Sequence, residues 1–344
     1  MNQSVERIAS SRREEVQRKL ESFHADIRRA VSKVVVGADD AIEKLLLSLI
    51  VGGHVLLEGV PGVAKTTLAK VFAHVLGIEF HRVQFTPDLL PSDVTGTYIL
   101  DRKTNDFVLR KGPIFCQLLL ADEINRAPAK TQSSLLEAMQ ELQVTVEGTT
   151  LPLPRPFMVL ATQNPVEQEG VYRLPEAQLD RFLVRIEMDY PPRQTEIDIL
   201  RLHGGMVGKT EEPSSDGQET GGVGIHMPDP VCSVEKILEI RSLLAQVYAE
   251  PGLVEYVVDL SRVSRSHPDL YLGASPRASL FLLQAARARA LLDARHYATH
   301  EDVRKIAPAV LGHRLILKPE AEVEGKSTAD VIETLFSQVP VLRS

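Results

Sequence analysis

The segment from Gly59 to Thr66 reads Gly-Val-Pro-Gly-Val-Ala-Lys-Thr and stands between an apolar run and a helical pattern. Such a turn directs several backbone N–H groups to one place, and the start of the following helix adds positive potential, so the segment suits phosphate groups. We expect Lys65 to reach the β- and γ-phosphates of a nucleotide and the Thr66 hydroxyl to bind Mg²⁺. The strict pattern has glycine before the lysine, and Ala64 fits there if its φ is negative. The alternative is a purely structural glycine turn. The predicted nucleotide-binding residues here are Gly59, Pro61, Gly62, Val63, Ala64, Lys65, Thr66 and Thr67.

Two acids, Asp122 and Glu123, end the apolar run of residues 117–121. Charges at the end of a buried strand are costly unless a cation or hydrogen bonds meet them. Mg²⁺ meets that need at Asp122, so Thr66 and Asp122 are the predicted metal-binding pair. Glu123 would take a proton from an attacking water, or orient it, which indicates hydrolysis rather than transfer to another substrate. The alternative is an acid pair that caps the next helix.

Asn164 ends another apolar run and precedes a proline. An Asn-Pro pair usually marks a turn. Beside the two acids, however, the amide could donate to a γ-phosphate oxygen and hold the water.

These residues must be positioned by strands and helices that alternate along the chain. Strands are expected at 53–58, 80–85, 118–121, 158–161 and 182–188, with helices between them. Such alternation predicts an α/β fold with a parallel sheet covered by helices on both faces. Two segments break the alternation, and we expect inserted hairpins at about 98–110 and 143–151.

The flanking segments suggest further divisions of the chain. Residues 1–32 are expected to form an N-terminal helix, with a capping box at Ser11–Glu14, packed on its own domain or alternatively on a partner. The nucleotide-binding core would span 33–202. Seven glycines and three prolines among residues 203–230 predict a flexible linker, and 231–344 a smaller all-helical domain.

Composition limits the classes of function. The chain has 344 residues and a net charge of −7, which disfavours non-specific nucleic-acid binding through Lys and Arg. An aromatic content of 5% with no Trp also disfavours stacking on bases. Two cysteines are too few for a disulfide framework or a four-ligand zinc site. Without a secretory signal or a membrane span, the expected location is the cytoplasm.

Together the motifs resemble those of AAA+ ATPases. Gly59–Thr66, Leu118–Glu123, Asn164 and Gly273–Arg277 stand in the order Walker A, Walker B, sensor 1 and sensor 2. More narrowly, the chain resembles the MoxR family over roughly residues 20–320. The segments that carry this resemblance are Ala121–Ala127, Leu135–Met139, Ala161–Pro165 and Leu174–Phe182.

The resemblance implies an AAA+ core with a helical lid, ATP as the nucleotide, and a ring of identical subunits, often hexameric. The two hairpins would be the helix-2 insert and the pre-sensor-1 insert, which usually face the pore and handle substrate. It also implies a chaperone-like ATPase that assists assembly or metal insertion of a client protein, often with a partner bearing a von Willebrand factor A domain. No metal other than Mg²⁺ is expected.

The resemblance also implies roles for two arginines. Arg181 would be an arginine finger that reaches a neighbouring subunit's γ-phosphate. The alternative is an ion pair of Arg181 with Asp180 or Glu176 of its own chain. Arg277 would be sensor 2, acting within its chain or across the interface. The implied catalytic set is Lys65, Glu123, Asn164, Arg181 and Arg277.

Three further points stay open at this level. Val36 and Gly37 resemble the segment beside the adenine, although a short apolar run can equally be core. Arg126 and Arg173 are further interface candidates. The competing functions are a nucleic-acid-directed AAA+ motor and a scaffold in which nucleotide only sets the oligomeric state.

Overall fold

A computed structural model of the chain describes residues 2–164, 172, 174–204 and 227–341. At its centre is a five-stranded parallel sheet in the order β2-β5-β8-β1-β9, which confirms the predicted α/β fold class. Buried apolar runs such as Leu-Leu-Leu-Ala in β5 are what a sheet covered on both faces requires. The strands are β1 (Val55–Gly59), β2 (Phe80–Gln84), β5 (Leu118–Asp122), β8 (Met158–Gln163) and β9 (Val184–Met188).

Helices cover both faces of this sheet, and alternate strand residues enter two separate hydrophobic clusters. In β5, Leu118 and Leu120 join a cluster with α2 (Asp39–Val51) and α3 (Lys65–Leu76). Leu119 and Ala121 join a cluster with α5 (Ala129–Glu141) on the other face. The remaining helices of this part are α4 (Pro91–Thr95), η1 (Ile124–Arg126), α6 (Glu176–Leu179) and α7 (Arg193–His203).

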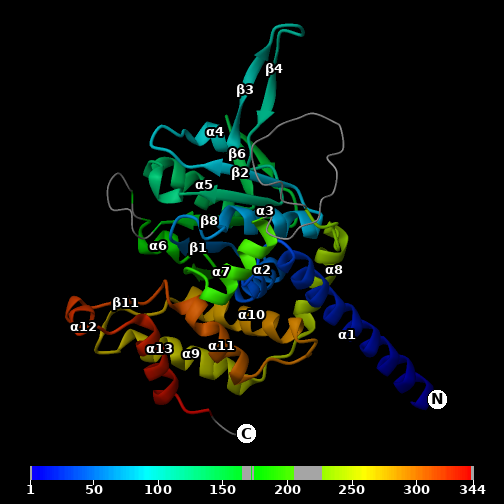
Figure 1. Cartoon of the computed structure of the whole chain (residues 1–344), viewed down its shortest axis with the longest axis vertical. Helices are drawn as coiled ribbons and strands as arrows, with labels where there is room; N and C mark the ends of the chain where they lie inside the picture. The colour runs from blue at the N-terminus through cyan, green and yellow to red at the C-terminus, as the bar shows by residue number, and fades with distance from the viewer. Residues whose placement is uncertain (1, 165–171, 173, 205–226, 342–344) are drawn as a thin grey trace.

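Antiparallel pairs lie where the sequence predicts hairpins. β3 (Gly96–Asp101) pairs with β4 (Asp106–Lys111), and β6 (Gln143–Val146) pairs with β7 (Thr149–Pro152). Figure 1 shows the β3–β4 hairpin projecting from the sheet at the end of the molecule opposite the C-terminus.

The N-terminal helix α1 (Asn2–Ser32) begins earlier than the sequence analysis expects. The predicted capping box at Ser11–Glu14 is wrong, because no glycine or proline interrupts residues 2–10 and the helix continues through them. From Leu20 onward the helix buries one face, with Phe23 and Ile27 each 1% exposed in the cluster that holds α2 and α3. This face therefore packs on its own chain (Figure 1).

The C-terminal region is helical, as predicted, but it also contains one short antiparallel strand pair. The pair joins β10 (Leu270–Leu272) to β11 (Ile316–Leu317), and strands this short leave no periodic pattern in a sequence. Residues 205–226 of the predicted linker lie outside the described residues. The helices are α8 (Val234–Leu243), η2 (Leu244–Gln246), α9 (Pro251–Arg265), α10 (Pro276–Leu292), α11 (His300–Leu311), α12 (Pro319–Val323) and α13 (Thr328–Gln338).

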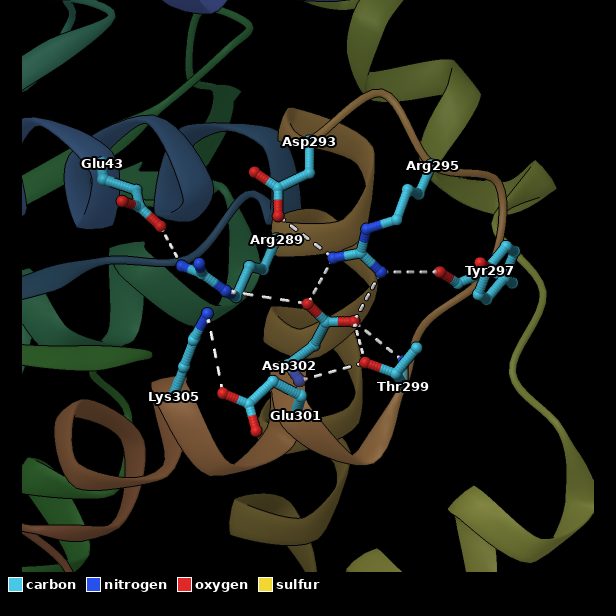
Figure 2. Close-up of polar contacts among 9 residues, drawn as sticks. All are labelled: Glu43, Arg289, Asp293, Arg295, Tyr297, Thr299, Glu301, Asp302 and Lys305. Atoms are coloured by element: carbon cyan, nitrogen blue, oxygen red, sulfur yellow. Dashed lines mark hydrogen bonds and ion pairs between the residues drawn. The ribbon is translucent and has the colours of Figure 1, made fainter.

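A buried carboxylate, Asp302 of α11, joins the C-terminal helices to α2 (Figure 2). Arg295 donates to both of its oxygens, and Arg289 lies 3.7 Å from it while also pairing with Glu43 of α2. Burial alone would raise the pKa of Asp302, but hydrogen bonds from Arg295 and Thr299 outweigh it and lower the pKa. Within the described parts of the chain, no helix is both long and apolar enough to cross a membrane.

Candidate nucleotide-binding site

The glycine-rich loop connects the carboxyl end of β1 to the first turn of α3. A Cβ at Gly59 would lie 2.3 Å from the Met188 carbonyl oxygen, so only glycine allows β1 to run this close to β9. Gly62 has φ +86°, and in the described part of the chain no atom beyond its chain neighbours lies within 4 Å of where its Cβ would be. Ala64 has φ 61° and ψ 25°, so the expected negative φ is wrong. The left-handed conformation explains why the strict pattern prefers glycine there.

Lys65 and Thr66 are the first residues of α3, and both face the carboxyl edge of the sheet. Lys65 Nζ donates to the Gly59 carbonyl at 2.5 Å and lies 3.4 Å from the Gln163 carbonyl at the end of β8. Asp122 is the last residue of β5, and its Oδ2 lies 3.4 Å from the Thr66 hydroxyl. Asp122 Oδ1 accepts a 2.6 Å hydrogen bond from Thr162 of β8.

Glu123 and Asn164 complete this edge. Glu123 has φ 56°, and its backbone N–H donates to Thr162 at 2.8 Å. Its carboxylate accepts from Gln84 Nε2 at 2.7 Å and lies 3.2 Å from Arg126 Nε. Asn164 follows β8 directly and is 7% exposed. Because β1, β5 and β8 are adjacent and parallel, their carboxyl ends bring these residues to one place.

The residues present fit a nucleotide with Mg²⁺. A hydroxyl and a carboxylate, the oxygen donors that Mg²⁺ prefers, adjoin each other at Thr66 and Asp122. The turn at Gly62 adjoins the N-terminus of a twelve-residue helix, where backbone N–H groups and the helix dipole favour phosphate. No described side chain fills the space beside Gly62.

Arg181 and Arg277 lie together, but away from this edge. They line a cavity of about 220 Å³ with Gly53, His54 and Phe281. Gly53 and His54 precede β1, so the cavity is at the amino end of the strand whose carboxyl end carries the loop. The structure therefore does not bring either arginine to Lys65 of the same chain.

The expected ion-pair alternative for Arg181 is wrong. Its guanidinium donates to the Leu136 carbonyl at 2.7 Å, while its Nε is buried and has no hydrogen-bond partner among the described residues. Asp180 pairs instead with Arg314, at 2.8 Å, and accepts from Ser275.

Of the two adenine-side candidates, Gly37 lies against α7. Val36 is half-buried, and Gly37 has φ +78° with its Cβ position 2.6 Å from Thr195. Thr67 is half-buried in the first turn of α3, and Pro61 and Val63 flank Gly62 in the loop. Arg126 contacts Glu123, and Arg173 lies outside the described residues.

Sequence reasoning missed three residues that contact the two acids: Arg82, Gln84 and Thr162. Arg82 and Gln84 alternate on β2, and a charged residue in a strand pattern was the only signal. They reach the two acids because β2 lies beside β5 in the sheet. The order of strands in a sheet cannot be predicted from the sequence of one strand.

Comparisons with known proteins agree with this geometry. Residues 54–184 match the family described as "ATPase family associated with various cellular activities (AAA)", and residues 262–335 match an AAA lid domain. "Uncharacterized protein YeaC" of Bacillus subtilis is 45% identical over 329 residues, which cover 94% of this chain and 98% of that protein. "Chaperone MoxR1" of Mycobacterium tuberculosis is 42% identical over 318 residues, covering 90% and 80%. A crystal structure from Cytophaga hutchinsonii, provisionally described as an ATPase, has a TM-score of 0.85 and 40% identity and covers 98% of this chain and 99% of its own. The chain therefore belongs to the MoxR family of AAA+ ATPases.

Proposed function

We propose that this chain hydrolyses ATP with Mg²⁺ and uses the reaction, as a ring of identical subunits, to remodel a client protein. The observation that carries the proposal is the approach of Thr66 to Asp122, 56 positions away in the sequence, at the edge where Lys65 begins α3. A glycine turn with a structural role alone would not need a hydroxyl and a buried carboxylate converging beside it.

Each residue at this edge of the sheet would have its own role in hydrolysis. Lys65 would bind the β- and γ-phosphates, and Thr66 with Asp122 would hold the metal. Mg²⁺, when bound, neutralises phosphate charge. Glu123 would orient a water and accept its proton, once Gln84 and Arg126 release its carboxylate. Asn164 would hold that water against the γ-phosphate.

Two arginines would come from the neighbouring subunit. Support comes from the cavity that Arg181 and Arg277 share, because it lies at the amino end of β1 and Lys65 lies beyond the carboxyl end of that strand. Arg181 and Arg277 both line this cavity, and a guanidinium there is a positive charge that a partner's phosphate could meet. We propose that Arg277 acts in trans with Arg181, in a ring that we expect to be hexameric.

The client would meet the β3–β4 hairpin. Its cross-strand pairs Ile99–Val108 and Leu100–Phe107 leave apolar side chains exposed on both faces, with Phe107 71% exposed. Exposed apolar surface of this kind suits protein contact. We further propose that the chain works with a partner protein that carries a von Willebrand factor A domain, in the assembly of complexes or the insertion of metal into a client.

We also propose a cytoplasmic location, because the reaction depends on the cellular supply of ATP.

The decisive experiment replaces Glu123 with glutamine. Glu123→Gln should bind ATP with unchanged affinity and release phosphate about 10²- to 10⁴-fold more slowly. Calorimetry measures the binding and a phosphate-release assay measures the rate. A pull-down with the same variant in the presence of ATP should then retain client and partner proteins. Normal turnover by Glu123→Gln would remove Glu123 from the proposed role.

A further inference from the structure

Arg82 of β2 binds the carboxylate that is proposed to hold the metal. β2 is the edge strand beside β5, and the Arg82 side chain reaches across to the end of β5. Its Nη2 and Nε donate to Asp122 Oδ2 at 2.7 and 3.0 Å. The other oxygen, Oδ1, accepts from Thr162.

The contact satisfies a carboxylate that is largely withdrawn from water. The Asp122 side chain is only 11% exposed, so its charge needs a cation or further donors. Arg82 supplies both, as a positive charge with two N–H groups on one oxygen.

The same oxygen faces the Thr66 hydroxyl, at 3.4 Å. An ionised carboxylate oxygen has two lone-pair directions, and Oδ2 already accepts from Arg82 Nε and Nη2 and, at 3.4 Å, from the Thr66 hydroxyl. A divalent cation held by Thr66 and Asp122 would have to displace at least one of these donors from Oδ2. Arg82 and the cation therefore compete for one atom.

Arg82 is placed so that it can leave. Its side chain is 48% exposed, in contrast to that of Asp122, and its Nη2 also donates to Gln84 Oε1 at 2.8 Å. Displacement from Asp122 would thus move the guanidinium toward Gln84 and solvent rather than bury a charge without a partner.

We infer that Arg82 is a displaceable counter-ion of Asp122, which Mg²⁺ replaces when it binds with the nucleotide. Arg82 is then a positioning residue that sets the Mg²⁺ concentration at which the site fills. The inference rests on the proposed ATPase function and deepens it.

The test measures binding rather than turnover. A non-hydrolysable ATP analogue is titrated into wild type, Arg82→Gln and Arg82→Lys by calorimetry, over a range of Mg²⁺ concentrations and in EDTA. Arg82→Gln should lower the half-saturating Mg²⁺ concentration by roughly ten-fold, within the range usual for coupled sites. Affinity in EDTA should not change. Arg82→Lys keeps a charge without the two-pronged contact and should fall between the two.

Arg126→Gln is the matched control. It removes an equal charge from the neighbouring acid, Glu123, so a general electrostatic effect would shift its Mg²⁺ dependence as much as Arg82→Gln does. Equal shifts would overturn the inference, and so would no shift in Arg82→Gln. A loss of affinity in EDTA would overturn it as well, by making Arg82 a phosphate contact. Thermal unfolding of each variant checks that it is folded.

The same titrations separate this inference from the proposed function. If the wild-type protein binds no nucleotide, the proposed function is wrong. If it binds nucleotide and the substitution of Arg82 does not change the Mg²⁺ dependence, only this inference is wrong.

Discussion

At the scale of single residues, two non-glycine residues of the site have the left-handed backbone conformation, which residues with a Cβ rarely adopt. Ala64 and Glu123 both have positive φ, at 61° and 56°. One stands directly before Lys65 and the other directly after Asp122. Such strain persists only where surrounding contacts fix it, as the bond from the Glu123 N–H to Thr162 does here. The loop geometry is thus maintained against a local backbone preference.

Replacing Ala64 by glycine tests this strain. A left-handed residue with a Cβ costs about 1–2 kcal/mol, while glycine adds about 0.4–1 kcal/mol of unfolded-state entropy. Ala64→Gly should therefore leave the free energy of unfolding unchanged or raise it by up to about 1.5 kcal/mol. The exposed helical residue Ala25 is the control, since Ala25→Gly should lower it by about 1 kcal/mol. Urea unfolding of both variants decides, and equal destabilisation would contradict a left-handed Ala64.

At the scale of elements, a buried histidine ties β1 to its neighbours. His54, just before β1, accepts from the Val159 N–H of β8 at Nδ1, at 3.0 Å. Its Nε2 must then carry the proton and donate to the Met139 carbonyl at the end of α5, at 2.9 Å. The ring is therefore neutral, and burial lowers its pKa to about 4.

This histidine makes stability depend on acidity. Between pH 6.5 and 4, His54 binds a proton in the unfolded chain but stays neutral in the folded chain. The free energy of unfolding therefore decreases as the pH falls. The loss approaches about 3 kcal/mol at pH 4. His54→Gln keeps polar atoms but cannot titrate. Urea unfolding from pH 7 to 4.5 should show a steeper loss in wild type than in His54→Gln, and parallel curves would contradict the assignment.

The elements also show how far a sequence can be read. Strands such as β5 and β8 are evident because both faces are buried and the run is apolar throughout. The glycine-rich loop and the two acids, Asp122 and Glu123, could be predicted as a site because each directly follows an apolar run that reads as a strand. The conformation of Ala64 could not be read, because it depends on where the chain must turn after Gly62. Arg82 could not be assigned either, because its partner is reached only through the order of strands in the sheet.

At the scale of the whole molecule, one arginine fastens the C-terminal helices to the segment that carries Arg181. Arg314 follows α11, and its side chain is 2% exposed. It donates to the Asp180 carboxylate at 2.8 Å and to the Leu183 carbonyl at 3.2 Å. Ser275, the N-cap of α10, donates to the same carboxylate at 3.0 Å. Asp180, directly before Arg181, is thus tied to the N-cap of α10, whose second residue is Arg277.

Breaking this pair should be costly. Burial lowers the pKa of Arg314 to about 10 despite its bonds to Asp180, so the charge depends on that partner. Removing one member of a buried pair typically costs about 3–5 kcal/mol. We expect Arg314→Met to fall in this range by urea unfolding, and Asp180→Asn combined with Arg314→Met to cost less than the sum. Lys326→Met, which removes an exposed pair with Asp269, should cost far less. Additive effects would rule out the coupling.

The separation of Lys65 from Arg181 makes a prediction about assembly. If each active site takes Lys65 from one subunit and Arg181 from the next, Lys65→Ala and Arg181→Ala are each inactive in a homogeneous ring for different reasons. Mixed in equal amounts and allowed to exchange, about one quarter of interfaces should join an intact Lys65 to an intact Arg181, as expected for a head-to-tail ring. The mixture should therefore regain phosphate release that neither variant has alone. The double variant mixed with wild type serves as the control, because it supplies neither group and can only dilute activity. No recovery on mixing, with subunit exchange verified by fluorescence transfer between labelled chains, would mean that Arg181 does not act across the interface.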